Sequence, residues 1–183
     1  MFNRKPFQQL AYLFYEVRLH VNVHWWRWFG CWFSSPVIAV CAYRLDRFFY
    51  LLLGGRIWAL IRIFLSPLSL FLRPWLGRCE IHYRADIGKG LKILHPGLGI
   101  VVSGQAMIGE HLTLTGGNCI GGRSGMKVGD LVLGNKVSLG ANAVILGPAR
   151  IGNNVQIGAG AVVVKDANDN TTLVGVPALP VNP

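Results

Sequence analysis

The sequence predicts a mainly β protein, with a parallel β-helix over residues 80–183 that follows an α-helical region over residues 1–79. Three features of the 183-residue chain support this prediction. Aliphatic residues recur every six positions after residue 80, and all but four of the 23 glycines lie in the same part of the chain. All nine Phe and all six Trp come before residue 80. The composition therefore changes where the repeat begins, and we expect the domain boundary there.

The six-residue period indicates a solenoid, in which each turn packs only on its neighbours. The period gives thirteen aliphatic positions in register: Ile81, Ile87, Ile93, Val102, Ile108, Leu114, Ile120, Leu133, Leu139, Ile145, Ile151, Ile157 and Val163. Three short strands joined by tight corners make one triangular turn, so we expect these side chains to point inward and to stack from turn to turn. The two interruptions, at residues 95–101 and 122–132, predict surface loops, where function concentrates.

Glycine often follows the aliphatic position, and asparagine occurs near it at 135, 142, 153 and 154. Sharp corners need a backbone with positive φ, which glycine and asparagine adopt more readily than other residues. We therefore expect these residues at the corners of the solenoid.

The first 79 residues predict helices, with breaks at 34–36, 54–55, 66–67 and 73–74. Their longest uncharged stretch, residues 28–43, is shorter than the roughly 20 apolar residues that cross a bilayer. Arginines at 44, 47, 56 and 62 alternate with large apolar residues. This pattern fits helices that lie in a membrane interface, and it equally fits a helical cap or an oligomer contact that buries the aromatic residues.

Charge and composition exclude several classes of protein. Hydrophobic residues make up 52% of the chain and charged residues 14%, which excludes disorder for most of it. The formal net charge is +10, but no nucleic-acid-binding motif accompanies it, so we expect no nucleic-acid partner. The four cysteines form no regular framework, and no cleaved signal peptide is recognisable, so we expect a cytoplasmic location, with the inner face of the membrane as an alternative.

The segments HPGLGIVV, IGGRSG and VGVPA, together with the repeats, resemble the hexapeptide-repeat acyltransferases. The resemblance runs from about Cys79 to Ala178 and is greatest to the serine acetyltransferase branch, which includes relatives associated with surface polysaccharide synthesis. It implies a left-handed β-helix, a trimer-based assembly, and acetyl-CoA as co-substrate in grooves between adjacent subunits, with no metal.

The resemblance also implies the catalytic residues. His95 matches the catalytic histidine of the family, and Glu80, before an Ile-His dipeptide, stands where the family usually has an Asp that orients this histidine. The two residues are 15 positions apart, close to one turn, so we expect them to lie a strand spacing apart, roughly 4.8 Å. A neutral imidazole suits the removal of a proton from an acceptor hydroxyl, and a carboxylate would hold it in the right tautomer.

For acetyl-CoA, the glycine pair of the family matches Gly121 and Gly122, and two corners that approach the pantetheine arm match Ala141 and Ala159. Lys165 lies where it could meet a CoA phosphate, although a solvated lysine is the commoner explanation.

The acceptor is suggested by departures from the family. Serine-using enzymes have an acidic residue before the catalytic histidine, where this chain has Leu94. They also have an Arg-His pair in the loop after the glycines, where this chain has no histidine and only Arg123 and Lys127 as substitutes. These differences favour a sugar hydroxyl, of a surface polysaccharide or its lipid-linked precursor, over free serine.

Serine O-acetylation for cysteine synthesis remains the alternative. A non-catalytic scaffold or a zinc enzyme is a third interpretation, because the fold alone implies no chemistry. A zinc site needs converging histidines, but residues 82, 95 and 111 lack whole-turn spacing, and the pair at 20 and 24 has no further ligand.

Overall fold

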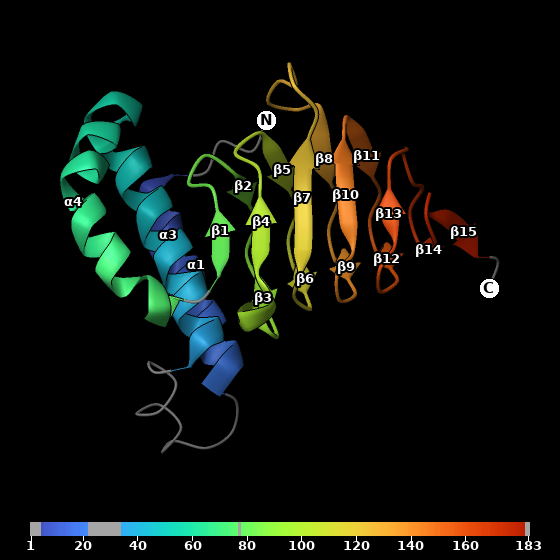
Figure 1. The fold of residues 1–183 in the computed structure, drawn as a ribbon, viewed down its shortest axis with the longest axis horizontal. Helices are drawn as coiled ribbons and strands as arrows, with labels where there is room; N and C mark the ends of the chain where they lie inside the picture. Colours follow the sequence, from blue (N-terminus) through green and yellow to red (C-terminus); the bar gives the residue numbers. More distant parts are fainter. Residues whose placement is uncertain (1–4, 22–33, 77, 182–183) are drawn as a thin grey trace.

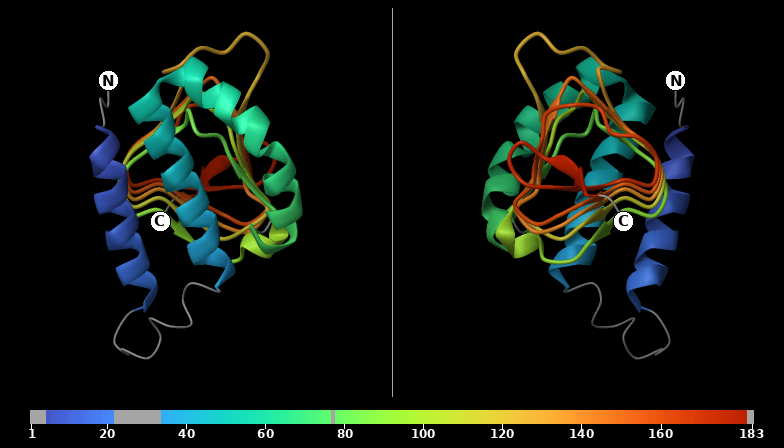
Figure 2. Two further views of the ribbon diagram at one scale, coloured as in Figure 1. Left: turned by 90° about the vertical axis from the view of Figure 1, so that its left-hand side faces the viewer. Right: turned by 90° about the vertical axis from the view of Figure 1, so that its right-hand side faces the viewer.

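The computed structural model describes residues 5–21, 34–76 and 78–181, and it shows a β-solenoid of triangular cross-section with helices at one end (Figures 1 and 2). Sheet 1 contains β1 Cys79–Ile81, β4 Ile100–Val102, β7 Asn118–Gly122, β10 Val144–Gly147 and β13 Val162–Val163. Sheet 2 contains β2 Asp86–Ile87, β5 Ala106–Ile108, β8 Leu131–Leu133 and β11 Ala149–Ile151. Sheet 3 contains β3 Lys92–Ile93, β6 Thr113–Leu114, β9 Ser138–Leu139, β12 Gln156–Ile157, β14 Thr172–Val174 and, antiparallel to β14, β15 Leu179–Val181.

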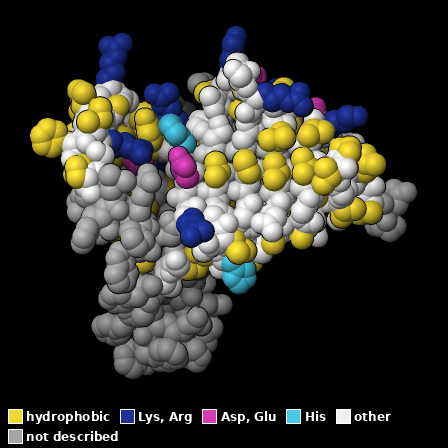
Figure 3. All heavy atoms as spheres, in the orientation of Figure 1, with side chains coloured by type: hydrophobic (Ala, Val, Ile, Leu, Met, Phe, Trp, Pro, Cys, Tyr) yellow, Lys and Arg dark blue, Asp and Glu magenta, His cyan; other side chains and the backbone are white. Residues whose placement is uncertain are grey.

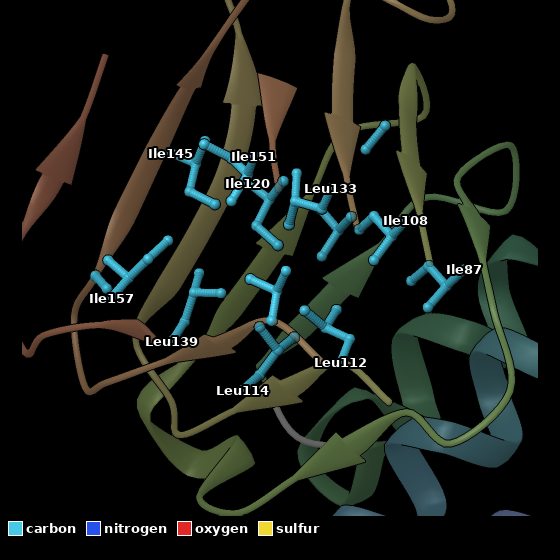
Figure 4. Packing of buried hydrophobic residues seen from close by; sticks show 14 of the residues in the cluster. Ile87, Ile108, Leu112, Leu114, Ile120, Leu133, Leu139, Ile145, Ile151 and Ile157 are labelled. Carbon is cyan, nitrogen blue, oxygen red and sulfur yellow. The ribbon is translucent and has the colours of Figure 1, made fainter. Parts of the chain in front are cut away.

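The aliphatic residues of the repeat form the core, which confirms the predicted parallel β-helix. In sheet 1 the register pairs Ile81 with Val102, Val102 with Ile120, Ile120 with Ile145, and Ile145 with Val163. Sheets 2 and 3 stack their own members of the repeat in the same way (Figure 4). Ile81 is half-buried, and the other twelve positions of the repeat are buried. Hydrophobic burial along three parallel columns therefore fixes the register of the turns.

The corners follow the prediction in part. Asn142 and Asn154 have positive φ values of 57° and 56°, as expected. The prediction is wrong for Asn135 and Asn153, which come one residue before the positive-φ position. Their side chains instead bind the preceding turn: Asn135 Oδ1 accepts the N–H of Glu110 at 2.8 Å, and Asn153 Oδ1 accepts the N–H of Asn135 at 2.9 Å. Asparagine at a corner thus serves either the backbone conformation or the hydrogen bonding between turns.

Glycines after the aliphatic positions in sheet 2 are needed for close approach and not for positive φ. A Cβ atom on Gly134 would lie 2.7 Å from the carbonyl carbon of Gly152, and one on Gly109 would lie 2.6 Å from Gly134 O. Gly134→Ala is therefore expected to cost about 1–3 kcal/mol of unfolding free energy, because the backbones of two turns must separate. Urea denaturation followed by circular dichroism would measure it. Gly97→Ala, where the added Cβ meets nothing within 4 Å, is the control.

Three helices cover the first turn of the solenoid: α1 Pro6–Val21, α3 Ser35–Leu53 and α4 Gly55–Leu76. Figure 2 shows them lying across its open end. Tyr43 of α3 enters the core, where its hydroxyl donates to Ala85 O at 2.9 Å and accepts from the N–H of Ile87 at 3.2 Å. The helices therefore satisfy polar groups at the sheet edge, which would otherwise be an unpaired end.

A buried ion pair joins the cap to the first turn. The Arg44 guanidinium is fully buried and donates to both carboxylate oxygens of Glu16, at 2.9 and 2.6 Å. It also donates to the carbonyls of Ile87 and Gly88, at 2.9 and 2.6 Å. Glu16 in turn accepts the backbone N–H of Leu91 at 2.8 Å. One charge pair thus links α1, α3 and the chain around β2.

These contacts correct the interpretation of the arginine pattern. Arg44 and Arg47 are buried and bind the solenoid; Arg47 lies 3.0 Å from Asp86. Arg62 pairs with Asp46 at 2.8 Å, which leaves Arg56 of the four as an exposed cation without a bonded partner among the described residues. Arg44 and Arg47 therefore make the contacts of a helical cap, and the membrane-interface interpretation of the helices stays a prediction.

The predicted breaks at 66–67 and 73–74 are also wrong, because α4 continues through both prolines. Proline removes the N–H that would bond the carbonyl four residues earlier. For Pro67 that carbonyl is Ile63 O, and the Ser66 hydroxyl donates to it at 2.7 Å. None of the helices that the structure describes is long and apolar enough to span a bilayer.

Candidate active site

The turns that connect sheet 3 to sheet 1 stack into one edge of the prism, which we call the His95 edge: residues 94–99, 115–117, 140–143 and 158–161. Backbone hydrogen bonds join each turn to the next: His95 N–H to Thr115 O at 2.8 Å, Asn142 N–H to Gly116 O at 2.9 Å, and Gly160 N–H to Ala141 O at 2.8 Å. The structure therefore brings His95, Ala141 and Ala159 onto the same edge.

His95 is held by its backbone while its side chain is exposed. It precedes the short 3₁₀ helix η1 Pro96–Leu98, whose proline presets the first helical position. The His95 carbonyl accepts the N–H of Leu98 at 3.2 Å. Within the described residues, the imidazole has no hydrogen-bond partner. Both ring nitrogens are thus free to bind a substrate hydroxyl on one side and a carboxylate on the other.

Glu80 points outward from the middle of β1, and the stacking prediction for it is wrong. Its register partner in the next turn is Val101 and not His95, because the loop at residues 95–101 lengthens this turn. The contact between this strand and the His95 loop is made by its neighbour Cys79, whose thiol lies 3.7 Å from Pro96 O. No hydrogen bond or ion pair joins the two side chains in the part of the chain described here.

A cavity of about 580 Å³ lies at the opposite side of sheet 1, where the chain passes from sheet 1 to sheet 2. We call this the loop edge. Two residues that the sequence predicted as site residues, Glu80 and Lys127, line this cavity. His82 and Arg84 also line it, and the sequence did not predict them as site residues. Arg84 and Lys127 form no ion pair with any described residue. The sequence signals that could have pointed to this cavity were the position of Arg84 just after a strand and that of Lys127 inside an interruption of the repeat.

The electrostatics of the cavity favour a neutral His82. Burial, and then the charges of Arg84 and Arg62, lower the pKa of His82 below its usual value near 6.5. Its Nδ1 accepts the backbone N–H of Arg84 at 3.1 Å, so the proton of the neutral ring is on Nε2. With His82 neutral, the charged side chains of the cavity are the cations of Arg84 and Lys127 and the carboxylate of Glu80.

The remaining predicted residues lie away from the His95 edge of the same chain. Gly121 and Gly122 end β7 at the loop edge, and Arg123 follows in the exposed loop. The Lys127 backbone N–H holds this loop through Asp130 Oδ2 at 2.7 Å. Lys165 is exposed beyond β13, also on the loop-edge side. Within one chain, therefore, the glycine pair and Lys165 do not meet Ala141 and Ala159.

The cysteine close to His95 is a poor nucleophile. Burial raises the pKa of the Cys79 thiol to about 11, so that it stays protonated at neutral pH. The described residues contain no group of three His, Cys, Asp or Glu side chains arranged to hold a metal ion.

The outer face of sheet 1, between the two edges, is apolar. Register stacks Glu80, Val101, Cys119, Val144 and Val162 in one outward row. Figure 3 shows this row of hydrophobic side chains crossing the face that carries β4, β7, β10 and β13. Such a continuous row is typical of a surface that contacts another protein chain.

Comparisons with known proteins agree with this architecture. The family described as bacterial transferase hexapeptide (six repeats) matches residues 130–165. The putative colanic acid biosynthesis acetyltransferase WcaB of Escherichia coli K12 is 34% identical over 152 residues, which cover 79% of this chain and 89% of that protein. Serine acetyltransferase 1, chloroplastic, of Arabidopsis thaliana is 43% identical over 101 residues, which cover 54% of this chain and 32% of that protein.

Among solved structures, the serine acetyltransferase CysE of Neisseria gonorrhoeae matches with a TM-score of 0.75 and 31% identity over 96% of this chain and 66% of that one. The solenoid and its exposed histidine edge define a hexapeptide-repeat transferase. The chain belongs to this family, together with WcaB and the serine acetyltransferases. It spans about a third of the Arabidopsis protein and about two thirds of the gonococcal one.

Proposed function

We propose that the chain is an O-acetyltransferase that moves an acetyl group from acetyl-CoA to a sugar hydroxyl. The observation that carries this proposal is the His95 edge, on which an exposed imidazole without a described partner stands in line with Ala141 and Ala159. Small side chains there leave room for a thin, extended group to lie along the solenoid. The acetyltransferases among its relatives support the same chemistry.

In this proposal His95 acts as the general base. It takes the proton of the acceptor hydroxyl as the oxygen attacks the thioester carbonyl, the C–O bond forms and the C–S bond breaks. His95 then returns the proton to the departing thiolate, so the imidazole is neutral at the end. Glu80 lies at the loop edge, so only the Glu80 of an adjacent chain can stabilise the transient imidazolium and fix its tautomer, as the carboxylate of a triad does. Backbone N–H groups supply the donors for the carbonyl oxygen.

We propose that the working site forms between chains of a trimer. The resemblance places acetyl-CoA between adjacent subunits, and the apolar row of sheet 1 supports burial of this face. If neighbouring chains meet there, the His95 edge of one chain comes close to the loop edge of the next. That arrangement would bring Gly121, Gly122 and Lys165 to the acetyl-CoA and Lys127 to the acceptor.

Two observations favour a sugar over serine as the acceptor: the share of each relative that this chain matches, and the charged residues of the loop-edge cavity. The match to WcaB extends over 89% of that protein, whereas the match to the chloroplast serine acetyltransferase covers 32% of it. Lys127 and Arg84 line the cavity and can bind acidic groups of the acceptor. Serine remains the second candidate, since the gonococcal serine acetyltransferase matches nearly the whole chain. The supply of acetyl-CoA places the reaction in the cytoplasm, at the inner face of the membrane if the acceptor is lipid-linked.

The acceptor can be tested directly. Purified protein with acetyl-CoA is assayed for CoA release with L-serine, with neutral hexoses and with hexuronic acids, and the acetylated product is identified by mass spectrometry. The proposal predicts an acetylated sugar and CoA release well above hydrolysis without acceptor.

Lys127→Gln is expected to raise the KM for the sugar more than that for acetyl-CoA. Release stimulated by serine alone would overturn the sugar assignment, and release with no acceptor preference would overturn both.

A further inference from the structure

The outer side of α4 carries a band of exposed apolar side chains, which we call the α4 face. Ile57, Leu60, Ile63 and Phe64 expose 57, 67, 69 and 90% of their surfaces. Their spacing puts them on the side of the helix away from Trp58, which is buried toward α3. In Figure 1, α4 is the helix farthest from the strands. The α4 face is therefore at the outer end of the molecule.

The apolar surface continues onto α3. Leu45, Phe49 and Leu52 are exposed at the i, i+4 and i+7 positions of this helix. The ring of Phe49 stacks on the buried Trp58 of α4 with centroids 5.1 Å apart, so the exposed apolar residues of α3 and α4 belong to two helices that pack together. Figure 3 shows hydrophobic side chains gathered at the α4 end of the molecule. A patch that extends over two helices exceeds the scattered apolar residues of an ordinary surface.

The exposed charges of the helical cap are positive. Lys5, Arg18 and Arg56 are exposed, and Arg56 lies on the same side of α4 as Leu60 and Ile63. Among the described helix residues the acidic side chains are Glu16 and Asp46, and both are bonded inside the protein: Glu16 to Arg44, and Asp46 to Trp58 at 2.6 Å and to Arg62 at 2.8 Å. The exposed charge of the cap is thus of one sign.

The α4 face is apolar, and the exposed charges of the helical cap are positive. Both properties match a bilayer whose interior is apolar and whose head groups are anionic. We propose that the α4 face docks on the anionic surface of a lipid bilayer, with α4 lying in the interface and Arg56 at the level of the head groups. A second copy of the cap fits less well, because its own exposed charges are positive and would repel. This proposal depends on the helices alone and not on the identity of the acceptor.

Vesicle flotation of the full chain tests the docking. Two kinds of vesicle are compared. One contains phosphatidylcholine with about 30% of the anionic lipid phosphatidylglycerol, and the other contains phosphatidylcholine alone. The expected result is binding to the anionic vesicles, at least about tenfold weaker binding to the neutral ones, and loss of binding in high salt. Ile63→Ser with Phe64→Ser is expected to weaken binding at least about tenfold. Arg56→Gln is expected to weaken it about fivefold.

Val176→Ser with Leu179→Ser is the matched control, since these exposed apolar residues lie at the other end of the solenoid. It is expected to bind vesicles like the unchanged protein. Equal binding to both vesicle types, or no binding, would overturn the proposal. A smaller oligomer of the Ile63→Ser, Phe64→Ser protein in sedimentation velocity without lipid would also overturn it, because the face would then join copies of the chain. Acetyl transfer to a soluble acceptor should stay unchanged in this variant, so a failure here is distinct from failure of the proposed activity.

Discussion

Changing His95 to alanine is expected to lower the kcat of acetyl transfer about 10²- to 10⁴-fold, the usual contribution of a general base. The acceptor hydroxyl is a poor nucleophile until its proton is taken. The KM for acetyl-CoA should change little, because the imidazole acts on the acceptor in the transition state. Steady-state CoA release, with the acceptor that the panel identifies, measures both constants.

His111→Asn is the matched control for this variant. His111 is a second histidine of the solenoid with positive φ of 59°, a conformation that asparagine tolerates. It should retain near-normal turnover. Circular dichroism and thermal unfolding of the His95→Ala protein establish that it is folded. A folded His95→Ala protein with turnover within tenfold of the unchanged protein would remove His95 from the mechanism.

Changing Arg44 to methionine is expected to reduce the free energy of unfolding by about 3–5 kcal/mol, because it leaves the buried carboxylate of Glu16 without its counter-charge. The carbonyls of Ile87 and Gly88 lose their donors as well. Urea denaturation at fixed protein concentration measures the loss, since an oligomer unfolds in a concentration-dependent way.

Arg62→Met is the control, because the Arg62–Asp46 pair is partly exposed and should contribute less than about 1 kcal/mol. Combining Arg44→Met with Glu16→Gln should recover part of the loss, as no unpaired charge then remains buried. If Arg44→Met unfolds at the same urea concentration as the unchanged protein, the ion pair does not hold the cap on the solenoid.

The solenoid could be predicted because its signal is local and repetitive. Each aliphatic residue of the repeat meets its counterpart in the next turn, so thirteen weak signals support one register. The corners at Asn142 and Asn154 followed from residue type for the same reason. The roles of Asn135 and Asn153 did not, since a side-chain bond to the preceding turn looks the same in sequence as a positive-φ corner.

The cap and the cavity could not be predicted in this way. Arg44 meets Glu16 from a different helix and the carbonyl of Ile87 from a strand, and no periodicity connects the three. The continuation of α4 past Pro67 depends on one hydroxyl bond from Ser66 to Ile63 O. The contacts of Arg44 join residues 28 and 43 positions apart, and such contacts appear only when the chain is folded.

For the candidate site, the structure shows His95, Ala141 and Ala159 on one edge, while their roles stay predictions from the resemblance. The argument from spacing failed for Glu80, because the loop before β4 lengthens the turn and pairs it with Val101. Arg84 was missed because a single cation after a strand resembles an ordinary surface residue.

The central claim is that acetyl-CoA lies along the His95 edge. A crystal structure of the protein with CoA bound tests it most directly. The claim predicts the CoA sulfur within hydrogen-bond reach of the His95 imidazole and the pantetheine arm against Ala141 and Ala159. CoA bound over sheet 2, or with its sulfur remote from every His95 of the assembly, would contradict it.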